Sequence, residues 1–328
     1  MTGRYPDGPL VMALAHYDRH VPFFEGAVIV GAEPLRVLEV GQNEPGRWGR
    51  GRHERMLRHQ EFDVAEVSLS SYLMAKDRGQ PFLAIPVFPR RLFSLSQIWV
   101  RRDGAIRHPR DLVGRRVGLN TFQTTLSVLA KADLKRVFDI DWRHITWVVA
   151  REETIAFQPP QGCRIESLPE GMRLHQALKS GLIDAVIVPH PSPAMLSDPE
   201  VGRLLDDPVA HEQAYFREHG YWPIMHVVVF REAVLQARPD LARQVFTAFE
   251  EAFSLCQARW QDPNWSWLAF GRHAFEAQRR ELSAEVWRNG LSANRPNLEW
   301  FLAQSRDQGL IDRLDSVEAL FHPSTWDT

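Results

Sequence analysis

One histidine lies inside a stretch that otherwise has the composition of a buried strand, "YWPIMHVVVF" at 221–230. β-Branched and aromatic residues dominate this stretch, as is typical of strands. Strand alternation places His226 on one face with large apolar side chains. Such an imidazole is either a core histidine with both ring nitrogens bonded or a group that gives and takes protons near neutral pH.

Polar residues gather where three other strand-like runs end. These turns read "HYDRH" (16–20), "EVSLSSY" (66–72) and "NTFQTT" (120–125). Helix N-termini offer unpaired N–H groups, and ligands of open α/β sheets bind beyond the carboxyl ends of strands. Serine and threonine are also ordinary N-cap residues, so each turn alone is open to a structural interpretation. Together with the basic pair Arg90-Arg91, the three turns predict a cleft for an anion.

The elements that would position these residues follow an alternating pattern. Strand-like and helix-like runs alternate along most of the chain, which predicts an α/β fold with largely parallel sheets. From about residue 232 the pattern is helical, with "PDLARQVFTAFEEAFSLCQARW" the clearest amphipathic stretch. The clearest expected strands are 10–17, 35–40, 62–68, 115–121 and 183–189.

Composition narrows the range of possible functions. The 328 residues suit one large domain or two of ordinary size, and the formal charge of −2 gives no reason to expect nucleic acid or an acidic membrane as partner. The apolar run near the N-terminus is too short for a secretory or membrane-spanning segment, so we expect a cytoplasmic protein. Two cysteines and the absence of C-x-x-C or H-E-x-x-H spacing indicate neither a disulfide framework nor a known metal motif.

Long stretches of the chain resemble the 4,5-dihydroxyphthalate decarboxylases. The resemblance runs from about residue 10 to 323, so it covers nearly the whole sequence. The stretches that carry it are "LAHYDRHVPFFEG", "RMLRHQEFDVAEVSLSSYLMAKDRG", "FLAIPVFPRRLF", "DLVGRRVGLNTFQTTLSVLAK", "GLIDAVIVPHPSP", "WPIMHVVVFR" and "NGLSANRPNLEWFLAQSRDQGL".

The resemblance implies the type 2 periplasmic-binding-protein-like fold, with two α/β lobes joined by two hinge strands and a ligand cleft between the lobes. We expect a discontinuous lobe 1 at 1–93 and 229–328 and a lobe 2 at 98–221. The hinge strands would lie near 92–98 and 222–229. His226 would then lie at the floor of the cleft, where a buried ionisable group is more often functional than structural.

The resemblance also implies an activity, the cofactor-independent decarboxylation of a hydroxylated aromatic acid similar to 4,5-dihydroxyphthalate. The ring carbon takes a proton while a para hydroxyl supplies electron density, and carbon dioxide leaves. This chemistry needs a proton donor, an acceptor at the phenol and a cation for the carboxylate that stays. We therefore expect a carboxy-lyase with no cofactor and a small aromatic carboxylate as partner, and a homo-oligomer is left open.

The predicted catalytic residues are His226, Asp18, Glu66 and His16. His226 is the candidate proton donor, and Asp18 or Glu66 would accept from the phenol or orient a histidine. The structural alternatives are that Asp18 pairs with a neighbouring charge and that Glu66 is a solvated strand-end carboxylate.

The predicted substrate-binding residues begin with two arginines, because a guanidinium binds a carboxylate bidentately. Arg91 is the first choice and Arg19 the second, whereas Arg90 is interpreted as a surface charge. His190 either lines the cleft or faces solvent, and Trp222 is expected in its wall. The full set is Arg19, Ser68, Ser70, Arg91, Gln123, Thr124, Thr125, His190 and Trp222.

Three departures from the family pattern predict a changed substrate. In "RLFSLS", Ser94 and Leu95 stand where the family has a basic pair, and His16 adds an imidazole. The Gly- and Arg-rich segment 41–53 is expected to form a mobile loop at the cleft mouth. Alternatives are a non-catalytic cytoplasmic binding protein for a small carboxylate, another aromatic-acid enzyme on the same scaffold, and a divalent metal held by two histidines and two carboxylates, for which no ligand spacing is recognised.

Overall fold

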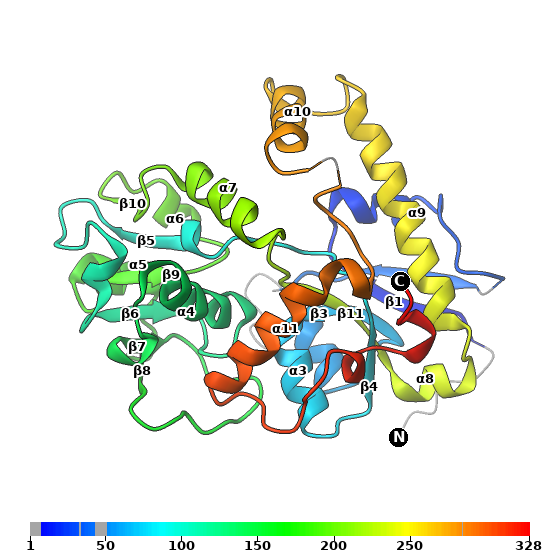
Figure 1. Ribbon diagram of the computed structural model, residues 1–328, viewed down its shortest axis with the longest axis horizontal. Helices are drawn as coiled ribbons and strands as arrows, with labels where there is room; N and C mark the ends of the chain where they lie inside the picture. The colour runs from blue at the N-terminus through cyan, green and yellow to red at the C-terminus, as the bar shows by residue number, and fades with distance from the viewer. Residues whose placement is uncertain (1–7, 33, 43–50, 284) are drawn as a thin grey trace. The chain divides into compact units, whose positions relative to one another are not determined.

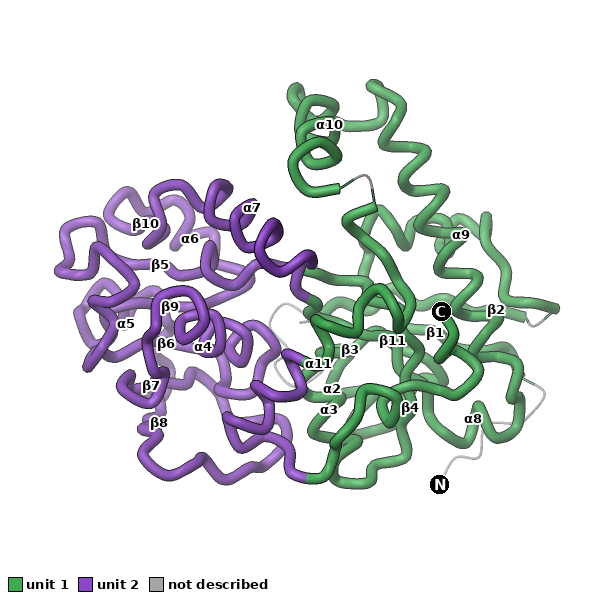
Figure 2. The backbone as a smooth tube through the Cα atoms, in the orientation of Figure 1, with its two compact units in different colours: residues 1–91, 224–299, 313–328 green, residues 92–223, 300–312 purple. Residues whose placement is uncertain are grey.

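A computed structural model describes residues 8–32, 34–42, 51–283 and 285–328 (Figure 1). The chain divides into two compact units, shown in different colours in Figure 2. Unit 1 takes the chain up to Arg91 together with Ile224–Glu299 and Arg313–Thr328, and unit 2 takes Leu92–Pro223 and Trp300–Asp312.

Two details of this division differ from the expected lobes. Residues 300–312 were expected in lobe 1 but pack in unit 2, where Gln308 donates a hydrogen bond to the carbonyl oxygen of Val128 at 2.9 Å. The second half of the expected hinge strand near 222–229 belongs to β11 (His226–Arg231), an internal strand of the unit 1 sheet. Its β-branched residues were read correctly as a strand, but strand pairing rather than composition decides whether a strand is a connection or a sheet member.

Unit 1 is built on a mixed sheet, which among the described residues has five strands in the order β2-β1-β3-β11-β4. β1 runs parallel to β2 and β3, whereas β11 runs antiparallel to β3 and β4. The other strands are β1 (Leu10–Leu14), β2 (Leu35–Glu39), β3 (Val64–Ser68) and β4 (Phe82–Ile85).

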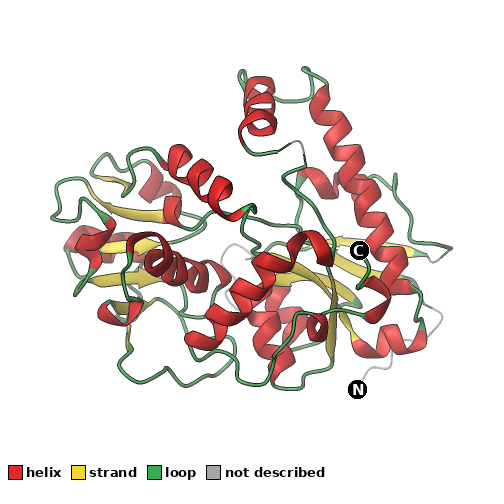
Figure 3. Cartoon of the chain, viewed as in Figure 1, coloured by secondary structure: helices red, strands yellow, loops and turns green. Residues whose placement is uncertain are grey.

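The helices of unit 1 cover the sheet, and Figure 3 shows them in red. The apolar face of α9 carries Val245, Phe249 and Ala252 into one core with Val228 and Phe230 of β11. This burial of large apolar side chains, worth about 1.5–3 kcal/mol each, fixes the sheet under the helix. The helices are α1 (Val21–Phe24), α2 (Arg52–Leu57), α3 (Leu69–Asp77), α8 (Glu232–Ala237), α9 (Leu241–Gln261), α10 (Gly271–Glu281) and the first part of α11 (Leu291–Asp307).

Unit 2 has its own sheet, with six described strands in the order β10-β5-β9-β6-β7-β8. The strands from β9 through β6 and β7 to the edge strand β8 run parallel to one another, and β5 runs antiparallel to β9 and β10. The strands are β5 (Ile98–Arg101), β6 (Arg116–Leu119), β7 (Thr146–Val149), β8 (Arg164–Ser167), β9 (Ala185–Ile187) and β10 (Val201–Arg203). The helices are α4 (Thr125–Phe138), α5 (Leu174–Ser180), α6 (Pro193–Leu196) and α7 (Pro208–His219).

Candidate active site

The centre of the candidate site is a buried pair, Glu66 on β3 and His226 at the start of β11. In the antiparallel ladder His226 lies opposite Ser68 and Val228 lies opposite Glu66, so all four side chains share one face of the sheet. Nδ1 of His226 hydrogen-bonds Oε1 of Glu66. His226 is 2 % exposed and Glu66 is fully buried. Residues 160 positions apart in sequence therefore form one buried hydrogen-bonded pair of titratable groups.

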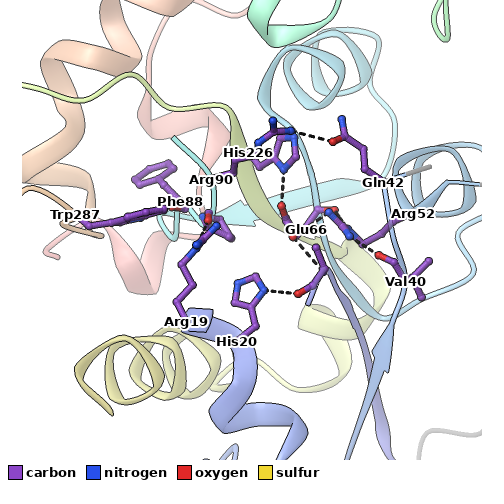
Figure 4. Close-up of polar contacts among 12 residues, drawn as sticks. Arg19, His20, Val40, Gln42, Arg52, Glu66, Phe88, Arg90, His226 and Trp287 are labelled. Carbon is purple, nitrogen blue, oxygen red and sulfur yellow. Dashed lines mark hydrogen bonds and ion pairs between the residues drawn. The ribbon is translucent and has the colours of Figure 1, made fainter. Parts of the chain in front are cut away.

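Arg52, the first residue of α2, holds Glu66 from the other side (Figure 4). Its guanidinium forms an ion pair with Oε2 of Glu66 at 2.9 Å and donates to the Glu66 carbonyl oxygen at 2.7 Å. It also donates to the carbonyl oxygen of Val40, and it has no exposed surface. The two carbonyl contacts hold the guanidinium in place, and the ion pair fixes the Glu66 carboxylate relative to His226.

The electrostatics of the cluster set the protonation states. Burial alone would raise the pKa of Glu66, but Arg52 and the hydrogen bond with His226 outweigh burial and hold that pKa well below its usual range. Burial, opposed by Glu66, lowers the pKa of His226 to about 4. At neutral pH the pair is thus a carboxylate and a neutral imidazole. Because the carboxylate accepts from Nδ1–H, the lone pair lies on Nε2 of His226.

Two more buried imidazoles lie beside this pair. The His53 ring meets the His226 ring edge-on at 4.8 Å, and His20 donates from Nδ1 to the carbonyl oxygen of Ala15 at 2.9 Å. In the described part of the chain, Nε2 of His20 and Nε2 of His53 are buried and have no hydrogen-bond partner. Burial lowers the pKa of His20 to about 4 and holds that of His53 well below its usual range.

The pKa of His20 predicts how stability depends on pH. The imidazole has a pKa of about 4 in the folded protein and an ordinary pKa of 6.5 when exposed to water, so the unfolded chain binds more protons and the free energy of unfolding falls as pH decreases through this window. We expect wild type to lose about 3 kcal/mol more than His20→Leu between pH 7 and pH 4. Denaturant unfolding at both pH values measures this difference, and equal losses in the two proteins would contradict it.

Sequence reasoning missed Arg52, His53 and His20. The segment 41–53 drew attention only as a loop, and its residues 43–50 lie outside the described part of the chain. From the turn "HYDRH" the sequence predicts His16 as the site residue. His16 is exposed near Glu39, with Nδ1 to Oε2 at 3.6 Å, so the imidazole that this turn brings to the cluster is His20.

Arg91, the first of the two predicted arginine clamps, is hydrogen-bonded to other parts of unit 1. Arg91 is 5 % exposed and donates to the carbonyl oxygen of Arg288 and to Oδ1 of Asn294, both at 2.6 Å. Burial lowers its pKa to about 9. These contacts fasten Arg91 against α11, and its role as a substrate clamp stays a prediction.

The alternative interpretation of the pair Asp18 and Arg19 fits the structure. The Arg19 guanidinium pairs with Asp18 at 3.1 Å and lies between the rings of Tyr17 and Trp287, 4.2 and 4.3 Å from their centroids. Asp18 also accepts from Nε1 of Trp260 at 2.8 Å. Both charges are therefore used in packing this corner of unit 1.

Arg90, interpreted from the sequence as a surface charge, is half-buried beside the cluster. Its side chain donates to Oε1 of Gln42 at 2.9 Å (Figure 4), and its carbonyl oxygen accepts from the His226 N–H at 3.2 Å. A dipeptide of like residues gives no local signal for which arginine is buried in the packing, here Arg91, and which lies beside the cluster, here Arg90.

Two predicted serines belong to this region. Ser68 is the N-cap residue of α3 and lies opposite His226 in the ladder, and Ser70 is 1 % exposed in the first turn of α3. Ser68 therefore shares the face of the sheet that carries Glu66 and His226. The role of both serines in substrate binding stays a prediction.

The other predicted substrate-binding residues belong to unit 2, so they are no part of the cluster in unit 1. The Gln123 side chain exchanges hydrogen bonds with the backbone of Ile155 at 2.8 and 3.2 Å, and Thr124 caps α4 through Ser127. The N–H groups of Phe122 and Gln123 donate to the Glu153 carboxylate, so this turn holds an anion from its own chain. Thr125 is buried, His190 is exposed, and the Trp222 ring stacks on Phe93.

Ser94, which departs from the family pattern, hydrogen-bonds a buried carboxylate in unit 2. Ser94 donates to Oδ2 of Asp133 at 2.6 Å, and Tyr215 donates to Oδ1 at 3.1 Å. Burial raises the pKa of Asp133 to about 7. The residues that surround the small hollow here are Phe93, Ser94, Leu95, Asp133, His211, Glu212 and Tyr215.

Neither a metal-binding cluster nor a membrane-spanning helix is found in the described residues. They contain no group of three or more histidine, cysteine, aspartate or glutamate side chains placed to hold a metal ion. Among the helices that the structure describes, none is long and apolar enough to cross a membrane.

The fold is that of the periplasmic-binding-protein-like proteins. The periplasmic aliphatic sulphonate-binding protein SsuA of Escherichia coli superposes with a TM-score of 0.57 at 13% identity, covering 98% of this chain and 99% of that one. The alkanesulfonate-binding protein SsuA of Xanthomonas axonopodis, bound to MOPS, gives 0.54 at 15% identity, covering 97% and 99%. The desulfurization enzyme DSZB gives 0.53 at 14% identity, covering 97% and 98%. At these identities the likeness shows the fold alone.

Sequence similarity identifies the family. The 4,5-dihydroxyphthalate decarboxylase of Comamonas testosteroni is 30% identical over 327 residues, covering 96% of this chain and 97% of that protein. The Pseudomonas putida protein of the same name is 32% identical over 221 residues, covering 65% and 83%. No family model matches the chain. The chain belongs to the 4,5-dihydroxyphthalate decarboxylase family, and its enzyme class is that of the carboxy-lyases.

Proposed function

We propose that this enzyme decarboxylates a hydroxylated aromatic acid similar to 4,5-dihydroxyphthalate, with His226 as the group that delivers a proton to the ring. Family membership supports the reaction class. The observation that carries the role of His226 is the buried chain from Arg52 through Glu66 to His226. This series of contacts engages Nδ1 of His226, so Nε2 is the nitrogen that can take up and donate a proton.

The proton balance of the proposed step is simple. Nε2 of His226 takes a proton from solvent, and the adjacent Glu66 carboxylate stabilises the imidazolium. The imidazolium then donates this proton to the ring carbon that bears the leaving carboxylate, and a para hydroxyl stabilises the positive charge on the ring. The bond to the carboxylate breaks, its electron pair returns to the ring, and carbon dioxide leaves. Each turnover consumes one proton.

The proposal includes no redox group and no pyridoxal, because the ring and its hydroxyl accommodate the electrons at every stage. The partner that it implies is a small aromatic carboxylate. Arg52 acts as a positioning residue, since it touches Glu66 and not the reacting atoms. Its positive charge keeps Glu66 ionised and therefore able to stabilise the imidazolium.

Carbon dioxide release from 4,5-dihydroxyphthalate and a panel of hydroxybenzoates tests this function, with and without a chelator. We expect release from at least one acid with a hydroxyl para to a carboxylate, and equal rates with the chelator. A loss of activity in the presence of the chelator would show that the reaction requires a metal ion. If an acid raises the melting temperature but no carbon dioxide is released, the protein is instead a binding protein for small carboxylates.

The pair predicts a specific pH profile. Because Glu66 raises the pKa of His226 against the effect of burial, Glu66→Gln lowers that pKa further and reduces the protonated fraction at every pH above it. We expect kcat at pH 7 to fall about 100-fold and the midpoint of the kcat decline with rising pH to move to lower pH. Glu61→Gln, an exposed carboxylate paired with Arg55, is the control. An unshifted midpoint would contradict the role of Glu66.

A further inference from the structure

The arginines of unit 1 near the Glu66–His226 pair differ in how their charge is used. Arg52 neutralises Glu66, and Arg19 pairs with Asp18. Arg91 is buried against α11. The Arg90 side chain donates to an uncharged amide, that of Gln42, and within the described ranges it has no carboxylate partner. Arg90 therefore keeps a positive charge that a ligand can neutralise.

Arg90 is also in the right place and accessible. Its carbonyl oxygen accepts from the N–H groups of Met225 at 2.8 Å and His226 at 3.2 Å, so its backbone is fixed against the start of β11. The side chain is half-buried, and its charge acts on the titration of both His226 and His53. Partial burial strengthens an ion pair, because less water screens the charge.

We propose that Arg90 binds the carboxylate that the substrate retains, next to the carboxylate that leaves, and so selects aromatic dicarboxylates over monocarboxylates. This inference rests on the proposed function. On a phthalate the two carboxylates occupy neighbouring ring carbons. A guanidinium beside His226 can hold one of them while the imidazole protonates the carbon that bears the other. The fork of guanidinium N–H groups also fixes the ring orientation, which a single-point contact does not.

Arg90→Gln tests the proposal in two independent ways. In kinetics with 4,5-dihydroxyphthalate, we expect KM to rise about 10- to 100-fold while kcat changes far less, as for loss of a hydrogen-bonded charge pair. In calorimetric titrations with phthalate, which has both carboxylates but no hydroxyls, Kd should rise by a similar factor. Catechol, which has the hydroxyls and no carboxylate, should bind wild type and Arg90→Gln equally.

Two further variants complete the design. Arg90→Lys keeps the charge without the fork and should recover part of the phthalate affinity. Arg58→Gln removes an exposed arginine of the same unit, which pairs with Glu54 at 2.9 Å, and should leave both measurements unchanged.

The outcomes separate this inference from the proposed function. Phthalate that binds Arg90→Gln as tightly as wild type, or that does not bind wild type at all, would overturn the role of Arg90. Phthalate binding that depends on Arg90 supports it. If wild type then releases no carbon dioxide from any acid in the panel, only the proposed function fails.

Discussion

Replacing His226 by asparagine is expected to lower kcat for decarboxylation by about 10² to 10⁴-fold with little change in substrate affinity. Asparagine is of similar size and keeps a polar contact to Glu66, but it cannot carry a proton to the ring. The measurement is carbon dioxide release under saturating substrate, with phthalate affinity determined on the same preparation. If His226 were only a structural residue, His226→Asn would reduce phthalate binding and protein stability together.

The matched control for this variant is His59→Asn, an exposed histidine of unit 1 that belongs to none of the predicted site residues. Its rate should equal that of wild type. A His226→Asn enzyme that binds phthalate normally and retains the wild-type rate would remove His226 from the chemistry. Another group would then have to supply the proton.

Replacing Arg52 by methionine is expected to destabilise the protein by about 3–5 kcal/mol, the largest effect on stability that we predict. Methionine fills much of the volume of the arginine stem, but it leaves the Glu66 carboxylate buried without its cation. It also leaves the carbonyl oxygens of Glu66 and Val40 without this donor. Urea unfolding followed by circular dichroism measures the loss.

Two companion variants identify the cause. Arg58→Met removes an exposed ion pair of the same helix region and should cost about 0–1 kcal/mol. The double variant Arg52→Met, Glu66→Leu removes both charges and should recover part of the lost stability, because an apolar pair carries no desolvation penalty. If Arg52→Met proved as stable as Arg58→Met, the ion pair would not be the element that holds this site together.

The pH predictions for activity and stability concern different imidazoles of one cluster. His20 donates to a backbone carbonyl, so its titration reports mainly on folding. His226 has a carboxylate partner, and in the proposed mechanism its titration also governs proton transfer to the substrate. A variant that shifts one profile and leaves the other unchanged distinguishes the two roles.

Residue types and their local spacing were enough to establish the chemistry available to the chain and much of its secondary structure. The alternation in "HVVVFR" predicted the strand that the structure shows as β11, and "VAEVS" lies in the strand expected at 62–68. His226 was chosen because it is a titratable residue within an apolar run, and Glu66 because it is a carboxylate at the turn where an expected strand runs into a helix. These are short-range properties, set by side-chain type and by the period of two residues in a strand.

Long-range packing, in contrast, selected which of these residues meet. The register of β11 on β3 brings His226 to Glu66 across 160 positions, and no local pattern encodes this pairing. Arg52 lies in the segment 41–53, for which a loop was expected, whereas the structure makes it the first residue of α2. Arg90 and Arg91 are chemically alike and adjacent, yet the bridge between Arg91 and Ile224 directs Arg91 into the packing and leaves Arg90 beside His226. Such choices depend on strand pairing and on contacts between distant segments, which the one-dimensional pattern of side chains does not contain.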